Sequence, residues 1–549
     1  MDPFQSCLKI KKKIYSAILN GRSFKWTRTH KRGKPESIET IPLVEIIAVQ
    51  KGLVEIVPCK KIINTPNDFT VFFVKRALKR QQRWILDKMV FTAEDSNLRD
   101  QWVSQLSQRI EQHGQQRPQR LLVFINPFGG RGKACKIYYS HIAQLFELAG
   151  INVHVLETER ANQARDYILQ KDLSSFDGVV CVGGDGMFSE LMHGLIGRSQ
   201  REACISEDDP EATLQGCSLR IGIIPAGSTN CVCFATVGVN DPITSALHII
   251  IGDSQPLDVC AVHHKKQLIK YSVSMVGYGF YGDVLSDSDK HRWMGPIRYD
   301  YSGFKVFLQN RSYQGIIEYQ LAGTGQSNPR DNTRCRTGCM VCSESTERLC
   351  CPEEMAFDNV SKRSYKSQGS DEEVIDEWCS TEGTFKAINM TCMSSACPKS
   401  PDGLSPCAHL ADGTADLIIV RKCSRVSFLR HLFRHTNQKD QFDLPFVDVY
   451  RVKALKFTPI PRDDDDDDDE SLGSTLPVHL AHGSVEQTKT SFLARLCGGP
   501  SRRSKWNCDG EVMPHAAINV RVHGQLIKLF ARGIEGPFIK RRESWMPYR

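Results

Sequence analysis

Three apolar segments between residues 120 and 230 each end in a loop of small residues, and this pattern limits the fold more than any other feature of the chain. The loops are Asn126-Pro-Phe-Gly-Gly-Arg-Gly-Lys133, Gly183-Gly-Asp-Gly-Met-Phe-Ser-Glu190 and Pro225-Ala-Gly-Ser-Thr-Asn230. Apolar runs predict strands at 121–125, 151–157, 178–182 and 219–224, and helical spacing predicts helices at 136–149, 161–170 and 187–195. This alternation predicts an α/β domain whose parallel sheet carries helices on both faces.

The three loops predict a phosphate-binding edge. In an open parallel sheet, ligands bind outside the carboxyl ends of the strands. A glycine loop followed by a helix lets backbone N–H groups approach phosphates. The first loop is not a Walker A motif, because Lys133 is followed by Ala134 rather than Ser or Thr. Each loop alone is compatible with a simple tight turn, but three loops at one edge predict a nucleotide-type site.

Asp185 is the carboxylate that three glycines surround in the second loop, between Gly184 and Gly186. Glycines there allow close backbone approach and unusual φ values. A carboxylate held at such a turn can accept the proton of a hydroxyl group while that oxygen attacks phosphorus. We therefore predict that Asp185 is a general base in phosphoryl transfer; the alternative is an Asp-Gly turn without a catalytic role.

The first 113 residues have the pattern of a small β-barrel closed by one helix. β-Branched and aromatic residues predict strands at 4–8, 14–18, 23–28, 41–48, 53–58, 69–74 and 83–91. A helix is expected from residue 93 to 110, with Thr92 as N-cap and an apolar stripe of Leu98, Trp102, Leu106 and Ile110. This arrangement resembles a pleckstrin-homology domain, and an unrelated β-barrel is the alternative.

Charge is concentrated at the N-terminus. Residues 1–120 carry 23 Lys and Arg against 11 Asp and Glu, a net charge of +12, whereas the whole chain carries +8. A basic first domain predicts an anionic partner, and nucleic acid and anionic lipid headgroups are both compatible with charge alone.

The remaining sequence completes a multidomain prediction. We expect a domain at 1–113, a linker at 112–120, an α/β domain at 118–260 and a β-rich sandwich domain at 261–540. Strands of the last are expected at 267–276, 312–319, 383–390, 416–421, 447–457 and 516–522. Polar inserts near 326–379 and 461–506, the second with seven consecutive aspartates at 463–469, are predicted to be disordered.

Composition and targeting signals predict a cytoplasmic protein. The hydrophobic fraction is 40% and the charged fraction 24%, as in soluble proteins. No run approaches the roughly 20 apolar residues of a transmembrane helix. The N-terminus lacks a signal-peptide pattern, and Asp2 excludes N-myristoylation. Most of the 21 cysteines are therefore expected to be reduced.

The three loops, in this order, resemble those of the diacylglycerol-kinase catalytic superfamily. The N-terminal domain, Gly277-Tyr-Gly-Phe-Tyr-Gly-Asp283, Trp506-Asn-Cys-Asp-Gly-Glu511 and the cysteine motif below extend the resemblance to the ceramide kinases. The resemblance implies a lipid kinase that uses ATP and Mg²⁺ to phosphorylate the primary hydroxyl of ceramide. Sphingosine or diacylglycerol are alternative acceptors. An inactive adaptor that binds phosphoinositide and calmodulin is the alternative from another class.

The resemblance also implies roles for individual residues. Asp185 resembles the group that activates the lipid hydroxyl. The ATP-binding set comprises Asn126, Pro127, Phe128, Gly129, Gly130, Thr158, Glu190, Gly227, Ser228, Thr229, Arg292, Arg298, Asp509, Gly510 and Glu511. The acceptor-binding set comprises Gly183, Gly184, Asp185, Gly186 and Asp283. Leu285 stands where sphingosine kinases have a carboxylate for the substrate amine, which suits a neutral amide. Peripheral binding to phosphoinositide-bearing Golgi and plasma membrane, and no nucleic acid, are also implied.

Two further motifs leave alternatives open. Cys335-x3-Cys339-x2-Cys342 has metal-ligand spacing, and Cys350 or Cys351 is a candidate fourth ligand for zinc; a cysteine cluster in a flexible insert, or redox-sensitive thiols, are the alternatives.

Residues 421–435 form a basic amphipathic segment with Val426, Leu429, Leu432 and Phe433 on one side. Such a helix binds calmodulin or membranes, or is an ordinary surface helix. The family resemblance favours calmodulin and stimulation by Ca²⁺.

Overall fold

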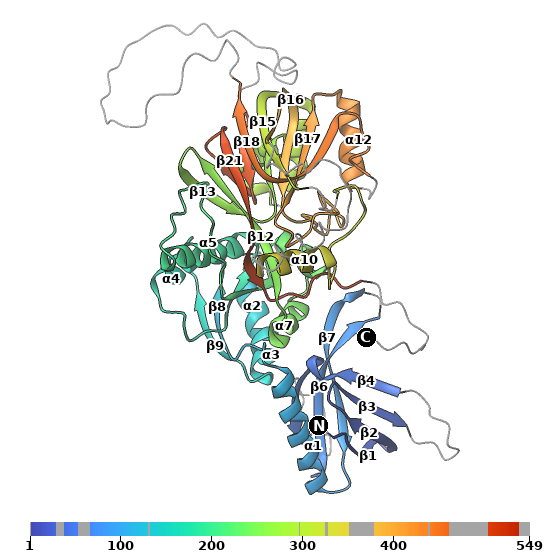
Figure 1. The fold of residues 1–549 in the computed structure, drawn as a ribbon. Helices are drawn as coiled ribbons and strands as arrows, with labels where there is room; N and C mark the ends of the chain where they lie inside the picture. Colours follow the sequence, from blue (N-terminus) through green and yellow to red (C-terminus); the bar gives the residue numbers. More distant parts are fainter. Residues whose placement is uncertain are drawn as a thin grey trace, which may run out of the picture.

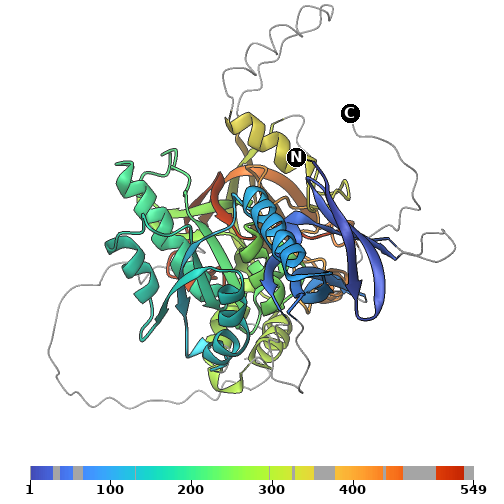
Figure 2. The ribbon, with the colours of Figure 1, turned by 90° about the horizontal axis from the view of Figure 1, so that it is seen from below.

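The computed structural model describes residues 2–28, 38–52, 66–78, 80–129, 132–295, 297–323, 328–350, 378–436, 440–460 and 503–536. Figure 1 shows three parts in a row: an N-terminal domain at one end, an α/β part in the middle and an antiparallel part at the other end. In the view from below, the helices of the α/β part lie beside the N-terminal domain (Figure 2). The predicted order of the three folds is confirmed.

The N-terminal domain is a seven-stranded antiparallel sheet closed by one helix, in the order β4-β3-β2-β1-β7-β6-β5. Helix α1 buries Trp102 and Leu106 against the sheet, as the apolar stripe predicted. The elements are β1 (Phe4–Ile10), β2 (Lys13–Leu19), β3 (Ser23–Arg28), β4 (Ile38–Pro42), β5 (Ile46–Lys51), β6 (Asp68–Ala77), β7 (Arg80–Thr92) and α1 (Ser96–His113).

Two local predictions in this domain are wrong. The N-cap of α1 is Asp95, whose side chain accepts a hydrogen bond from Leu98 N–H at 2.7 Å, rather than Thr92, which ends β7. The strand expected at 41–48 is two strands, because a 3₁₀ turn at Leu43–Glu45 interrupts it and buries Leu43. The strand expected at 53–58 lies outside the described residues.

The α/β part has the predicted parallel sheet, in the order β9-β8-β10-β11. Apart from the edge strand β9, its strands are almost wholly apolar because helices cover both faces. The elements are β8 (Arg120–Ile125), α2 (Ala134–Ile137), a π-helical turn (Tyr138–Ile142), α3 (Ala143–Leu148), β9 (Asn152–Glu157), α4 (Gln163–Gln170), β10 (Gly178–Gly183), α5 (Asp185–Glu202), β11 (Arg220–Pro225), α6 (Cys231–Val237) and α7 (Pro242–Ile251). Helices α6 and α7 were not predicted.

One strand near the C-terminus joins the α/β part to the antiparallel part. Strand β21 (Ile518–Leu529) pairs in parallel with β11 and antiparallel with β12 (Gln255–His264) and β18 (Val447–Pro459). The two parts therefore share one 14-stranded sheet. The other strands are β13 (Gln267–Ser272), β14 (Val276–Gly279), β15 (Tyr313–Leu321), β16 (Trp378–Thr391), β17 (Ala415–Arg421), β19 (Trp506–Cys508) and β20 (Glu511–Met513).

This part also contains helices, of which the sequence interpretation had considered only the basic amphipathic segment at 421–435. They are α8 (Phe280–Asp289), a 3₁₀ turn (Arg292–Met294), α9 (Ile297–Gln309), α10 (Met340–Cys350) and α12 (Arg425–Thr436). Asp283 consequently lies on a helix, not in a turn. The strand expected at 267–276 divides into β13 and β14, because residues 273–275 bend away from the ladder.

The predicted inserts are only partly irregular. Residues 328–350 fold and include α10, so the expectation of disorder is wrong there. Trp506 is fully buried in β19, which corrects the end of the second insert. Residues 351–377 and 461–502, including the aspartate run, lie outside the described residues.

The N-terminal domain packs firmly on the α/β part. Trp84 of β7 stacks on His248 of α7 with ring centroids 3.8 Å apart. The backbone N–H of Trp84 donates to Thr244 Oγ1 at 3.0 Å. The segment expected to be a linker is also fixed, since Arg117 donates to the Ile46 carbonyl at 2.7 Å. Among the described residues, no single helix is long and apolar enough to cross a membrane, although the bent pair α6 and α7 meets the length and composition criteria.

Candidate active site

The predicted loops meet at the carboxyl edge of the parallel sheet. The N–H of Asn126 donates to the Val182 carbonyl at 3.1 Å, and that of Ala226 donates to the Gly183 carbonyl at 2.8 Å. A Cβ on Gly227 would lie 2.5 Å from the Cα of Gly184. Only glycine permits this approach of two backbones, which explains the small residues in the second and third loops.

Asp185 is the first residue of α5, so the helix begins within the segment predicted as the second loop. Its Oδ2 accepts a hydrogen bond from Cys231 N–H and its Oδ1 one from Val232 N–H, both at 3.1 Å. These donors belong to the first turn of α6, a helix that follows the third loop. Burial raises the pKa of Asp185 above its ordinary value, and the two N–H donors oppose that shift. The carboxylate is thus oriented by backbone and largely dehydrated.

A cavity of about 280 Å³ opens in front of Asp185. It extends between the α/β part and the antiparallel part, so groups from both parts face it. Its lining is largely apolar, and Leu285 is part of it. The lining residues are Asp185, Phe188, Thr229, Cys231, Val232, Ser274, Met275, Tyr281, Val284, Leu285, Tyr299, Asn507, Asp509 and Gly510.

In the first loop, the side chain of Asn126 closes a turn by accepting backbone hydrogen bonds. Asn126 Oδ1 accepts hydrogen bonds from the N–H groups of Phe128 and Gly129, each at 3.0 Å. The Phe128 side chain is exposed, and Thr158 is buried at the end of β9, where its N–H donates to the Ile125 carbonyl at 2.9 Å. Pro127 is the second residue of this turn, and Gly130 lies outside the described residues.

Glu190 of α5 has a carboxylate oxygen, Oε2, that is buried and has no hydrogen-bond partner among the described residues. An unpartnered buried acceptor is costly. A donor on a bound molecule would satisfy it.

The third loop is organised by Asn230, which the sequence interpretation quoted but did not place in the site. Its Oδ1 accepts from Gly227 N–H at 2.9 Å and its Nδ2 donates to the Gly227 carbonyl at 3.1 Å. Asn230 adopts φ of +52°, a conformation that Asn tolerates better than most residues. Ser228 and Thr229 are left exposed. In the sequence, the position of Asn230 at the end of the loop, before a helix, was the feature that could have indicated this role.

The Asp509-Gly510-Glu511 element reaches the cavity, but its carboxylates already have partners. Asp509 accepts from the N–H groups of Val273, Ser274 and Met275, and from the Ser272 hydroxyl, at 2.7–3.0 Å. It therefore fixes the bend between β13 and β14. Glu511 forms a 2.6 Å ion pair with Lys270.

Of the predicted site residues, Asp185, Thr229, Asp509 and Gly510 line this cavity, whereas Arg292, Arg298 and Asp283 are among those that do not. Arg292 pairs with Asp289 at 3.2 Å, and Arg298 donates to the Tyr299 hydroxyl at 2.7 Å. Asp283 accepts from Ser504 Oγ at 2.7 Å and from the Tyr313 hydroxyl. Burial raises the pKa of Asp283.

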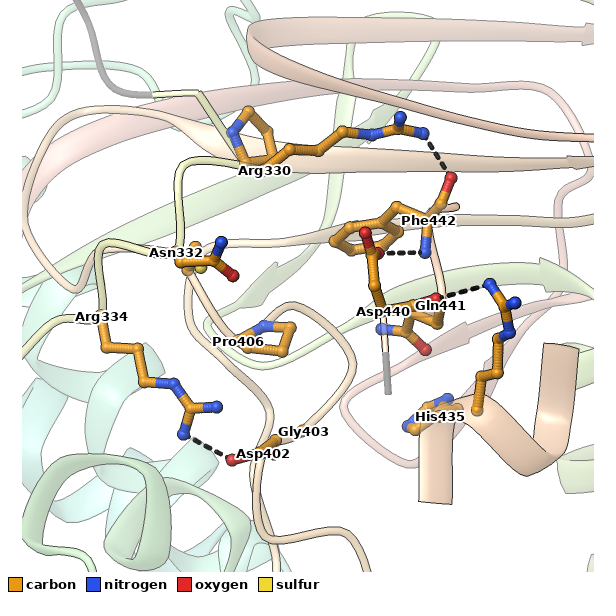
Figure 3. A pocket seen from close by; sticks show the side chains of 13 residues that line it. Arg330, Asn332, Arg334, Asp402, Gly403, Pro406, His435, Asp440, Gln441 and Phe442 are labelled. Atoms are coloured by element: carbon orange, nitrogen blue, oxygen red, sulfur yellow. Dashed lines mark hydrogen bonds and ion pairs between the residues drawn. The ribbon is translucent and has the colours of Figure 1, made fainter. Parts of the chain in front are cut away.

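A second hollow, of about 110 Å³, shares no lining residue with the first (Figure 3). Its walls are held by polar contacts of the protein itself. Arg334 pairs with Asp402 at 2.5 Å, and Arg330 donates to the Phe442 carbonyl. The arginines facing this hollow are thus engaged, and it offers no catalytic group comparable to Asp185.

Family models match three regions of the chain, and known proteins match nearly all of it. The ceramide kinase PH domain matches residues 4–106, the diacylglycerol kinase catalytic domain 120–262 and the ceramide kinase C-terminal domain 340–537. The chain is 46% identical to the ceramide kinase of Mus musculus over 553 residues, covering 97% of this chain and 98% of that protein. It is 45% identical to the Homo sapiens ceramide kinase over 543 residues, covering 97% of each. A crystal structure of a diacylglycerol kinase from Bacillus anthracis aligns with a TM-score of 0.44 and 14% identity, covering 75% of this chain and 97% of that one.

Proposed function

The chain belongs to the ceramide kinase family, and from this premise we propose that it transfers the γ-phosphoryl group of ATP to the primary hydroxyl of ceramide. It is an ATP-dependent lipid kinase. The acceptor side of the proposal rests on the half-buried Asp185 carboxylate, which faces a largely apolar cavity. An apolar cavity with one proton acceptor suits a lipid hydroxyl.

Asp185 acts as the general base in this proposal. The hydroxyl oxygen attacks the γ-phosphorus, its proton passes to a carboxylate oxygen of Asp185, and the bond from the γ-phosphorus to the bridging oxygen breaks to release ADP. The two N–H donors of α6 support the role because they fix the carboxylate orientation. The raised pKa brings the basicity of Asp185 closer to neutral pH, where a base is most effective.

The nucleotide lies, in the same proposal, across the three loops at the N-terminus of α5. Backbone N–H groups and the helix dipole there favour phosphate. The close contact of Gly184 with Gly227 leaves the loop edge free of side-chain bulk. The unpartnered Glu190 Oε2 supplies an acceptor for a hydroxyl or amino group of ATP.

The site fits Mg²⁺ held mainly by the phosphates. Four donors already occupy the Asp509 carboxylate, and Mg²⁺ commonly keeps several waters while binding phosphates and few carboxylates. Asp509 and Glu511 would then contact its water shell. Bound there, the ion neutralises charge on the β- and γ-phosphates.

Leu285 favours ceramide over sphingosine as acceptor. Its side chain lines the cavity and is 5% exposed. A protonated amine would meet no carboxylate at this position, whereas the neutral amide of ceramide needs none.

The N-terminal domain, a match to the ceramide kinase PH domain, places the enzyme on phosphoinositide-bearing Golgi and plasma membranes in our proposal. Its net charge supports binding to anionic headgroups. Co-sedimentation of the full chain with vesicles containing a phosphoinositide, compared with vesicles of neutral lipid, tests it. Equal binding to both would contradict the proposal.

Helix α12 is our candidate calmodulin site, through which Ca²⁺ would stimulate the enzyme. Val426, Leu429 and Phe433 are exposed by 79%, 39% and 57%, while Leu432 packs inward. Binding of Ca²⁺–calmodulin should be lost in Val426→Glu/Leu429→Glu and unchanged in Ser343→Glu, a surface change on α10. Unchanged binding by the double variant would exclude α12.

An acceptor panel tests the proposed function directly. The purified chain is given ATP, Mg²⁺ and, separately, ceramide, sphingosine or diacylglycerol, and the phosphorylated lipid is measured. We expect ceramide 1-phosphate as the main product. Preferred phosphorylation of another lipid would change the acceptor, and ATP binding without phosphotransfer to any lipid would favour the adaptor.

A further inference from the structure

The predicted cysteine motif lies in a folded segment and converges on a histidine that is distant in sequence. Cys335 precedes α10, Cys339 directly adjoins it and Cys342 lies in its first turn. His409 comes from the segment between β16 and β17. One ligand atom from each of these four residues lies within 4.8 Å of the others. Among the described residues, His409 is therefore the candidate fourth group. The Cys350 side chain and Cys351, the fourth ligands considered from the sequence, lie outside the described residues.

The distances match a tetrahedral metal site. The sulfurs of Cys335 and Cys342 are 3.7 Å apart, and the sulfur of Cys339 lies 3.2 Å from His409 Nδ1. Two thiolates at about 2.3 Å from one zinc ion are about 3.8 Å apart in tetrahedral geometry. A disulfide would bring two sulfurs to about 2.05 Å, and these cysteines are free thiols.

The surroundings of the four side chains favour a bound cation over a set of metal-free thiols. His409 is 2% exposed and Cys342 6% exposed. Backbone N–H groups of Leu410 and Cys342 donate to the sulfurs of Cys335 and Cys339. Such donors stabilise negative sulfur. Three sulfurs and an imidazole packed this closely need a cation to balance them if the sulfurs are thiolates.

We propose that Cys335, Cys339, Cys342 and His409 bind one Zn²⁺ ion in a closed structural site. Three thiolates and one imidazole are a common structural zinc set. Soft sulfur ligands in tetrahedral arrangement select against Mg²⁺ and Ca²⁺. Binding releases the three thiol protons to solvent and involves no oxidation or reduction.

The ion would join the segment before α10 to the segment between β16 and β17. The segment before α10 is also held by the Arg334–Asp402 pair (Figure 3) and by Thr337 N–H, which donates to the Ile534 carbonyl at 3.1 Å. The segment between β16 and β17 contacts α6, since the Ala396 carbonyl accepts from the thiol of Cys231.

Metal analysis of the full chain tests the site. After purification and dialysis without strong chelator, we expect about one zinc per chain. Cys339→Ser and His409→Ala should each reduce it about tenfold or more, whereas His409→Cys should retain it because a fourth thiolate replaces the imidazole. Cys423→Ser and Cys379→Ser, at half-buried cysteines outside the cluster, should keep the wild-type zinc content.

A measurement on the wild-type chain covers the case in which the variants fail to fold. Chelator treatment should remove the zinc and lower the melting temperature, because the metal binds the folded state. Addition of Co²⁺ should then produce thiolate-to-metal charge-transfer absorption and tetrahedral d–d bands. A wild-type chain that carries no zinc and takes up neither Zn²⁺ nor Co²⁺ would overturn the proposal, as would full zinc content in His409→Ala.

Discussion

At the scale of single residues, two opposing influences determine the pKa of Asp185. Burial destabilises its charged form, whereas the N–H groups of Cys231 and Val232 stabilise that form. Burial is the larger influence, so the carboxylate keeps its proton to a higher pH than an exposed aspartate. Asp509, on the same cavity, instead accepts four hydrogen bonds and serves as an anchor for residues 272–275. The two carboxylates therefore have different roles.

The first prediction concerns pH. Since only ionised Asp185 can accept a proton, kcat/KM should fall on the acid side with a pKa above the ordinary carboxyl value of 3.8. The stability of the folded protein should change with pH in the opposite direction to its activity. A carboxyl whose pKa is raised by folding destabilises the protein as pH rises from the unfolded-state pKa through the folded-state pKa.

The pH profile is measured with saturating Mg²⁺ between pH 4 and 9, with circular dichroism at each pH to confirm folding. Asp185→Asn should remove the stability decrease assigned to this group. A folded enzyme whose kcat/KM shows no acid limb down to pH 4 would contradict the account.

At the scale of elements, the site depends on glycines that let loops touch. The second prediction is that Gly227→Ala impairs both folding and catalysis. The new Cβ would lie 2.5 Å from Gly184 Cα and 2.7 Å from Asn230 Oδ1, an overlap that costs about 1–3 kcal/mol. Displacing the loops by even 1 Å can reduce turnover by about 100-fold.

The matched control is Gly303→Ala on α9, where a Cβ meets nothing within 4 Å. It should stabilise the helix by up to about 1 kcal/mol. Thermal unfolding and ceramide phosphorylation are measured for both variants. If Gly227→Ala behaved like Gly303→Ala, the loop contact would not be a determinant of the site.

Strands and loops with strong local signals could be predicted from the sequence, and elements defined by distant contacts could not. Strand β10 and the Asp185 loop follow from an apolar run and a glycine cluster. Helix α8 was missed because Gly279 and Gly282 indicated a turn, yet each glycine packs against a distant backbone, Lys386 and Lys505 respectively. His409 joins Cys339 only through folding. The roles of Arg292 and Asp283 stay predictions, although neither side chain faces the cavity.

At the scale of the whole molecule, the N-terminal domain is packed against the rest of the protein and is not loosely tethered. Trp84 is fully buried between His248 and the C-terminal segment, and its Nε1 donates to Glu535 at 3.0 Å. Arg76 of the same domain pairs with Glu535 at 2.8 Å. Strand β21 then connects this segment to the shared sheet. The orientation of the N-terminal domain is thereby linked to that of the active site.

The third prediction is that Trp84→Ala weakens this docking by about 3–5 kcal/mol, the usual cost of removing a large buried aromatic side chain. Limited proteolysis should then cut near residues 114–119 much faster than in the wild-type chain. Trp293→Ala is the control, because that side chain is 83% exposed and its loss should not change the cleavage rate. Equal cleavage of wild-type and Trp84→Ala chains would show that the docking does not depend on this contact.

The central claim is that Asp185 removes the proton from the lipid hydroxyl, and one measurement tests it most directly. Single-turnover transfer from ATP to ceramide is compared between wild type and Asp185→Asn, with ATP binding and thermal unfolding measured on the same samples. We predict that transfer falls by about 10²–10⁴-fold while ATP binding and folding are retained. Transfer by a folded Asp185→Asn enzyme within about tenfold of the wild-type rate, well short of the loss expected for a general base, would contradict the claim.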